Sequence, residues 1–287
     1  MRKKSEKKLS KWFIDFIESP ITPYAVLCIL ALFMLSPIIL MFLNSFKSIT
    51  EAFSWPPTIF PRNLSLEAYI RVFTSDVPLT LRNSVIISLA TTFIVVCTAL
   101  PTAYGLSRYP YRGSKLTLLF FLISRIIPPL SLLVPFYLLL SHLRLVNTFL
   151  GLIIVDTYLS LPLVIWMLKG FFDEFPQELI DSALIDGCSK IGAFLRVVLP
   201  LTSIAIAAAA IITFLWTWNE FIYAMVFTTT SDVSPITVGI FTFVGDEVIE
   251  WNSMCAVGVF TSLPAILFFI FAQKYVVEGL TKGAIKG

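Results

Sequence analysis

The chain has 287 residues, of which 57% are hydrophobic and 14% are charged, and its formal net charge is +3. A soluble domain carries about 25% charged residues, so this composition excludes a water-soluble globular protein and predicts an integral membrane protein. The single histidine, His142, excludes a His-rich metal cluster, and no metal site is expected. The four cysteines are scattered singly, as small apolar fillers would be, at Cys28, Cys97, Cys188 and Cys255.

Six apolar stretches are long enough to cross a hydrocarbon core about 30 Å thick, which takes roughly 20 helical residues each. They cover residues 23–44, 83–106, 116–138, 149–170, 201–227 and 253–276. Backbone groups in lipid must pair within the segment, and the alternation of a β-barrel is absent, so we expect an all-α polytopic fold. Prolines inside the spans, among them Pro128 and Pro129, predict kinks.

The basic residues predict the orientation of these spans. Residues 1–22 carry six Lys and Arg before a full-length span, without a small-residue cleavage site, so this is not a cleavable signal peptide. With alternating spans, 15 of the 21 Lys and Arg fall on the side of the N-terminus. The positive-inside rule therefore predicts that both termini are cytoplasmic in a multi-pass protein of the inner membrane.

The segments between spans differ in character. External segment 45–82 is too rich in proline for one continuous helix, although residues 66–73 could form two turns. The last external segment, about 228–251, carries acidic residues and no Lys or Arg. It would either face an external partner or be an ordinary solvated loop.

The cytoplasmic segment 171–200 contains a short polar helix. Pro176 suits a first-turn position, Gln177 and Glu178 follow it, and Gly187 ends the helix. Apolar residues recur at helical spacing at Leu179, Ile180, Ala183 and Leu184. Such a stripe would be offered to a partner outside the bilayer.

This segment resembles the "EAA" loop of the permease subunits of binding-protein-dependent ABC importers. The residues that carry the resemblance are Asp181, Ser182, Ala183, Gly187, Val197, Leu199 and Pro200. Asp181 and Ser182 stand for the family's Glu and first Ala and are only approximate matches. The resemblance implies a coupling helix that docks in a cleft of the ATPase subunit, and the alternative is an ordinary cytoplasmic loop helix.

Further motifs resemble the sugar permeases of maltose-type importers, above all their second, G-type subunit. They include Asn44–Lys47, Ile127–Pro129, Leu145–Thr148, Trp218–Glu220 and Gly279–Gly283. The resemblance implies a six-helix domain at 23–276 with the type I importer permease fold. It also implies a homologous second permease, two ATPase subunits that carry ATP and Mg²⁺, an extracytoplasmic solute-binding protein and a sugar substrate.

The tail at 277–287 follows the last predicted span. The resemblance places such a tail between the two ATPase subunits, where Gly279, Lys282 and Gly283 would make contacts. So much glycine gives the tail little reason to order alone, and the alternative is a frayed basic end.

Polar residues inside the spans are candidates for the translocation pathway, because ionisable groups there are costly and usually face a bundle interior or a cavity. Arg125 and Asp156 could pair, either as a structural link or in the pathway. Flat apolar faces and hydrogen-bonding groups, both of which sugars need, come together at Trp216, Trp218, Asn219 and Glu220. The alternative there is an interfacial aromatic belt.

The sequence contains no G-x-x-x-x-G-K-[ST] phosphate loop, no catalytic elbow and no zinc-binding helix motif. The chain is therefore expected to be a permease without a cofactor or catalytic residues of its own, with ATP hydrolysis on partner subunits. Membrane lipid is an expected partner and nucleic acid is not. Two other functions stay open: a secondary transporter, which would call for matched internal halves, and a membrane assembly or scaffold protein.

Overall fold

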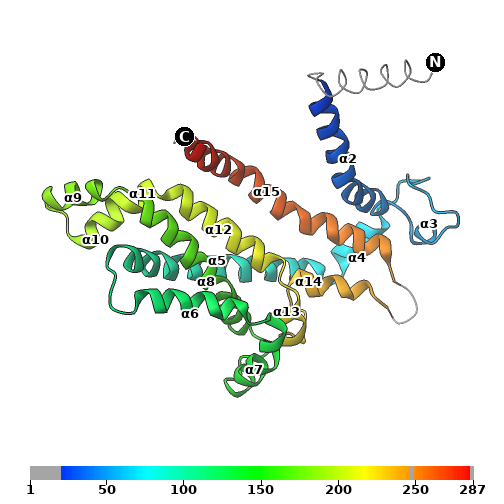
Figure 1. Cartoon of the computed structure of the whole chain (residues 1–287). Helices are drawn as coiled ribbons and strands as arrows, with labels where there is room; N and C mark the ends of the chain where they lie inside the picture. Colours follow the sequence, from blue (N-terminus) through cyan, green and yellow to red (C-terminus); the bar gives the residue numbers. More distant parts are fainter. Residues whose placement is uncertain (1–20, 246–248, 285–287) are drawn as a thin grey trace, which may run out of the picture. The chain divides into compact units, whose positions relative to one another are not determined.

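Apolar residues drive most of the described part of the chain into helices (Figure 1). A computed structural model describes residues 21–245 and 249–284. Within these ranges, strand-like pairing is limited to an isolated bridge between Val244 and Ile249. The chain divides into two compact units, one formed by the residues up to Tyr69 with Trp251–Val259, the other by Ile70–Glu250 with the residues from Phe260.

The first unit begins with helix α2, Ile21–Asn44, which coincides with the first predicted span. No residue of its most apolar 18-residue window is buried. Short α3, Ile49–Ala52, follows and is capped by the Ser48 side chain. Asn252, from the start of α15, donates to the Lys47 carbonyl oxygen at 3.1 Å and closes this unit.

The segment 45–82, which the sequence predicts to be external, is folded around the carboxylate of Glu51. Its Oε1 accepts hydrogen bonds from the Thr58 hydroxyl at 3.1 Å and the Arg62 amide at 2.7 Å. The bond from the Arg62 amide is the main reason why the pKa of Glu51 lies below its usual value. Helix α4, Glu67–Thr74, confirms the two turns expected near 66–73.

The second unit is built on three helices: α5, Val77–Arg108; α8, Phe149–Glu174; and α12, Ser203–Trp218. All three pack against one another. Small residues allow the close approach of helices that have no hydrophobic driving force within lipid. The alanines with no exposed surface in this core are Ala99, Ala103 and Ala209.

Two of the predicted spans are not continuous helices. Residues 116–138 divide into α6, Ser114–Ile126, and α7, Pro129–His142, which are bent by 98°. Pro129 cannot donate an amide bond, and Pro128 forces Ile127 into an extended conformation, so the helix ends instead of kinking.

The predicted span at 201–227 is interrupted as well. The segment Lys190–Leu201, which ends in helix α11, Leu199–Leu201, is bent by 75° relative to α12. Helix α12 ends at Trp218, and α13, Ile222–Phe227, starts afresh after a break. Asn219 turns its side-chain amide onto the Leu215 carbonyl, which favours the end of the helix.

The segment 228–251, which the sequence predicts to be the last external one, also contains helical turns. Helix α14, Ile236–Gly239, and a 3₁₀ turn, η2, Ile240–Phe243, follow α13. Gly239 packs so closely on α5 that an added Cβ would lie 2.3 Å from the Thr80 hydroxyl oxygen.

The final helix, α15, runs from Trp251 to Ala284 and contains the sixth predicted span. Residues 277–284 therefore continue a helix, and the expectation of an unordered glycine-rich tail is wrong for them. Among the described residues, three continuous helices are long and apolar enough to cross a membrane, and the two bent pairs raise the number to five.

Candidate coupling helix and membrane cavity

The short helix predicted in segment 171–200 is α9, Gln177–Ile185. Pro176 has an extended conformation directly before it, and Gln177 hydrogen-bonds to the Asp181 carboxylate at 3.0 Å across one turn. In unit 2, α9 and its neighbours α10 and α11 lie at the opposite end of α8 from α7 and α13 (Figure 1).

Gly187 ends α9 as the sequence predicted. Its φ of +87° is left-handed, a conformation in which glycine has no Cβ penalty. The Cys188 amide donates to the Ala183 carbonyl at 2.9 Å and the Gly187 amide to the Leu184 carbonyl at 3.1 Å. These two bonds form a Schellman motif, which satisfies carbonyls that would otherwise lack partners.

The apolar stripe of α9 is shared between the interior and the surface. Ile180 and Ala183 are buried against the core of the unit, so they do not face an outside partner as the sequence suggested. Leu184 is 37% exposed and the following Ile185 is 86% exposed. Asp181, Ser182 and Gly187 are also exposed. The exposed face of α9 thus combines polar groups with apolar ends.

Arg108, at the end of α5, holds the start of α9 in place. Its guanidinium donates to the Phe172 carbonyl at 2.5 Å, to the Phe175 carbonyl and to the Gln177 side chain at 3.0 Å. Planar guanidinium groups suit several fixed acceptors at once. Beside it, Ser107 donates to the Asp173 carboxylate at 2.6 Å. No local pattern in the sequence indicates these contacts of Arg108, which counts there only among the positive charges that predict the orientation.

The remaining residues of the "EAA" pattern lie beyond α10, Lys190–Ala193, in a π-helix, η1, Phe194–Val198, and in α11. Val197 and Leu199 are half-buried, and Pro200 is exposed. π-Helical turns are rare and frequently occur at functional sites.

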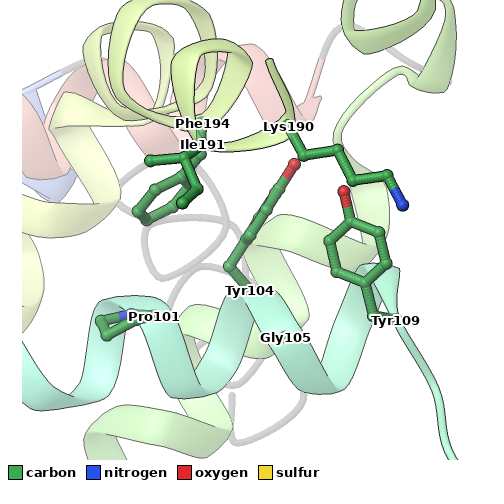
Figure 2. A pocket seen from close by; sticks show the side chains of 7 residues that line it. All are labelled: Pro101, Tyr104, Gly105, Tyr109, Lys190, Ile191 and Phe194. Carbon is green, nitrogen blue, oxygen red and sulfur yellow. The ribbon is translucent and has the colours of Figure 1, made fainter.

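A pocket of about 360 Å³ opens between α5 and the α10–η1 segment. Figure 2 shows the rings of Tyr104 and Tyr109 rising from α5 toward Lys190. The Lys190 ammonium lies 5.0 Å from the centre of the Tyr109 ring, and the Tyr104 ring packs 4.5 Å from that of Phe194. These contacts join the end of α5 to the chain that follows α9.

A larger cavity, of about 720 Å³, lies at the end of α12 and the start of α13. Ligand sites typically measure about 300–1,000 Å³. Three of the predicted pathway residues line this cavity, namely Trp216, Asn219 and Glu220. Pro129, Leu159 and Tyr223 are among its other lining residues. Trp216 is 45% exposed, so it presents an aromatic face to this space.

Glu220 also has a structural role at this cavity. Its carboxylate oxygens accept from the amides of Tyr223 at 2.8 Å and Ala224 at 2.9 Å, and so cap α13. The Tyr223 hydroxyl donates to the Pro129 carbonyl at 2.5 Å, at the start of α7. The α12–α13 break and the α6–α7 break therefore meet.

The structure does not place Trp218 at the cavity. Trp218 is buried, its indole N–H donates to the Thr261 carbonyl at 3.1 Å, and its ring stacks on Phe214. Trp218 therefore packs inside the unit and does not line this cavity.

The structure also does not pair Arg125 with Asp156. Arg125 donates to the Leu159 carbonyl at 2.5 Å, and its guanidinium lies 5.0 Å from the centre of the Trp216 ring. Asp156 is buried, and its Oδ1 atom has no hydrogen-bond partner among the described residues. Only the backbone is described at the tail residues Gly279, Lys282 and Gly283, which lie in α15.

Comparison with known proteins connects this geometry to a family. Residues 96–282 match the family described as the binding-protein-dependent transport system inner membrane component. The chain is 34% identical over 263 residues to the trehalose/maltose transport system permease protein MalG of Thermococcus litoralis, covering 90% of this chain and 94% of that one. It is 31% identical to the arabinooligosaccharides transport system permease protein AraQ of Halalkalibacterium halodurans, covering 92% and 94%.

A solved structure has the same fold. The chain matches a bacterial ABC transporter involved in the import of the acidic polysaccharide alginate with a TM-score of 0.78 at 21% identity, covering 89% of this chain and 95% of that one.

Proposed function

Because the chain belongs to the family of binding-protein-dependent transport system inner membrane components, we propose that it is one of two permease subunits of an ATP-driven sugar importer. It would receive the sugar from an external binding protein and couple its passage to two separate ATPase subunits through α9. ATP and Mg²⁺ would be bound by those ATPases. The relatives named for trehalose, maltose and arabinooligosaccharide transport support a carbohydrate substrate.

The observation that carries the coupling role is the construction of α9. Asp181, Ser182 and Gly187 are exposed together, while Ile180 and Ala183 fix the opposite face to the core of the unit. A rigidly attached helix with an open outer face can transmit a displacement. Movement of the ATPases would be passed on through α9 and the Arg108 contacts to α5 and α8.

The Trp216 cavity is the proposed contact with the sugar in this subunit. An aromatic face can stack on the C–H groups of a sugar ring, and the Asn219 amide can bind a hydroxyl. We further propose that both termini are cytoplasmic, so that α9 faces the ATPases and the segment 228–251 faces the binding protein. The end of α15, with Gly279, Lys282 and Gly283, would contact the ATPase pair.

The decisive experiment is reconstitution of the complex in proteoliposomes with its ATPases and binding protein. A thermal-shift screen of the binding protein first identifies the sugar. We expect sugar uptake only with ATP inside and binding protein outside. Uptake driven by an ion gradient without ATP would establish a secondary transporter, and no uptake under any condition would favour a scaffold protein.

A substitution at the cavity tests its part in uptake. Trp216→Ala removes the aromatic face and should lower uptake at least about tenfold, corresponding to about 1.4 kcal/mol of lost interaction. Trp55→Ala, at an external tryptophan that is 90% exposed, is the control and should leave uptake unchanged. Equal uptake by both variants would exclude Trp216 from the pathway.

A further inference from the structure

The ring of Trp216, which lines the large cavity, depends on one neighbour for its orientation. Among the described residues, its indole N–H has no hydrogen-bond acceptor and its ring stacks on no other aromatic ring. Its one specific contact is with Arg125, whose guanidinium carbon lies over the ring, 5.0 Å from the ring centre. Trp218, in contrast, is held by both a hydrogen bond and a stacked ring.

Arg125 itself is fixed to the core of the unit. It is the second-last residue of α6 and donates to the Leu159 carbonyl oxygen on α8 at 2.5 Å. Within the described ranges this carbonyl is its one acceptor, and no carboxylate forms an ion pair with it. A guanidinium is planar, so it can donate from its edge while its face stacks on an aromatic ring. Arg125 thereby ties a ring on α12 to the backbone of α8.

A charge at this position calls for a reason. Arginine within an apolar span is costly and marks a functional position by default. A cation in the last turn of a helix gains some energy from the helix dipole, but that gain would be the same whichever way the side chain pointed. It does not explain why Arg125 is directed onto Trp216.

The two faces of the Trp216 ring have different surroundings. Leu159 and Trp216 both line the cavity, whereas Arg125 does not. The guanidinium therefore covers the face of the ring that is turned away from the cavity. The opposite face is left open, in agreement with the 45% exposure of Trp216.

We infer that Arg125 is a positioning residue for the sugar contact: it holds the Trp216 ring with one face open to the cavity and does not touch the sugar itself. This inference rests on the proposed function of the cavity. Immobilising a side chain on binding costs free energy. A ring that is already fixed by a cation on its far face avoids that cost when the sugar arrives.

The test is ATP-driven uptake by the reconstituted complex, measured against the concentration of sugar-loaded binding protein. Arg125→Gln keeps a donor for the Leu159 carbonyl but removes the cation, and should lower the maximal rate about fivefold. The concentration of binding protein at half-maximal rate should not change. Arg125→Lys keeps a cation near the ring and should lose no more than about twofold. Lys115→Gln, at an exposed position of the same helix, is the matched control and should transport as the parent does.

A double-mutant cycle shows whether Arg125 acts through the ring. If it does, Arg125→Gln should cause no further loss when Trp216 is already replaced by alanine. The smaller effect of Arg125→Lys should vanish in the same background, which keeps the comparison open if Arg125→Gln does not assemble. An equal further loss on Trp216→Ala would reveal a merely structural residue and overturn the inference, and so would uptake by Arg125→Gln at the parent rate.

Fluorescence quenching by acrylamide follows the ring without measuring transport. Subtracting the signal of the matching Trp216→Phe protein isolates the contribution of Trp216. Quenching of this contribution should rise in Arg125→Gln, because the covered face of the ring becomes accessible, and unchanged quenching would contradict the positioning role. Raised quenching in a complex whose parent shows no ATP-driven uptake would instead reject the proposed function while leaving the support of the ring by Arg125 in place.

Discussion

Arg108 at the end of α5 is hydrogen-bonded to the carbonyl oxygen of Phe175, the residue that separates α8 from Pro176 and the start of α9. The same side chain reaches Phe172 and Gln177. One guanidinium thereby fixes the direction in which the proposed coupling helix leaves the membrane domain.

Replacing Arg108 should therefore loosen α9 while leaving the helices of the membrane domain intact. Lysine keeps the charge but not the planar fork, so we expect Arg108→Lys to lower sugar-stimulated ATP hydrolysis about tenfold, equivalent to about 1.4 kcal/mol. Arg112→Lys, at an exposed position in the α5–α6 connection, is the control. Stimulated hydrolysis at the parent rate in both variants would show that the clamp has no role in coupling.

Gly187 should be needed for coupling and not for insertion into the membrane. A Cβ at this position would meet no atom of the chain within 4 Å, so the cost of a substitution comes from the left-handed backbone, roughly 1–2 kcal/mol. Gly187→Val should insert normally but lose ATPase co-purification or sugar-stimulated hydrolysis.

Asparagine tolerates the left-handed region better, so Gly187→Asn serves as the companion variant and should retain more activity than Gly187→Val. Full transport by Gly187→Val at equal expression would remove the coupling role from this turn.

The close contact between α14 and α5 predicts a large difference between two glycines. Gly239→Ala would place a Cβ 2.3 Å from the Thr80 hydroxyl and should destabilise the protein by about 1–3 kcal/mol. Gly170 lies in α8 and has open space around it, so Gly170→Ala should be neutral or stabilising by up to about 1 kcal/mol. Thermal unfolding of the two purified variants measures the difference, and equal midpoints would contradict the packing at Gly239.

The charge distribution predicts the orientation of the chain. A reporter that works only in the cytoplasm should be active when fused after Gly287 and inactive when inserted near Ser54. Since 15 of 21 Lys and Arg fall on the side of the N-terminus in the predicted topology, this follows from the positive-inside rule. Activity at both positions, or only near Ser54, would exclude that topology.

Features governed by local chemistry were predictable from the sequence. Pro176 and Gly187 fix the ends of α9 through their own backbone preferences, and the structure places them there. Pro128 and Pro129 signalled a kink. The two prolines account for the end of α6, but the 98° angle between α6 and α7 was not foreseeable, because the start of α7 also accepts a hydrogen bond from the distant Tyr223.

Features that depend on distant partners were missed for the same reason. The acceptors of Arg108 lie 64 to 69 residues further along the chain, and no local pattern identifies them. Arg125 and Asp156 looked complementary by charge, but the helices direct Arg125 to a carbonyl and an aromatic ring instead. Trp216 and Trp218 lie two residues apart, and the sequence did not distinguish their roles. The orientation of α12 buries the Trp218 ring and leaves the Trp216 ring exposed.

The π-turn η1 changes which residues share a helix face. The Leu199 amide bonds to the Phe194 carbonyl, five residues back, and Ala193 and Val198, also five apart, both have no exposed surface. In an α-helix of 3.6 residues per turn, positions five apart point about 140° away from each other. The segment therefore carries one residue more than an α-helix between the same two anchors would need. If the exposed Leu195 were deleted, the segment could form a regular α-helix in which Ala193 and Val198 still face inward. Loss of one residue here need not alter how the segment packs on the membrane core.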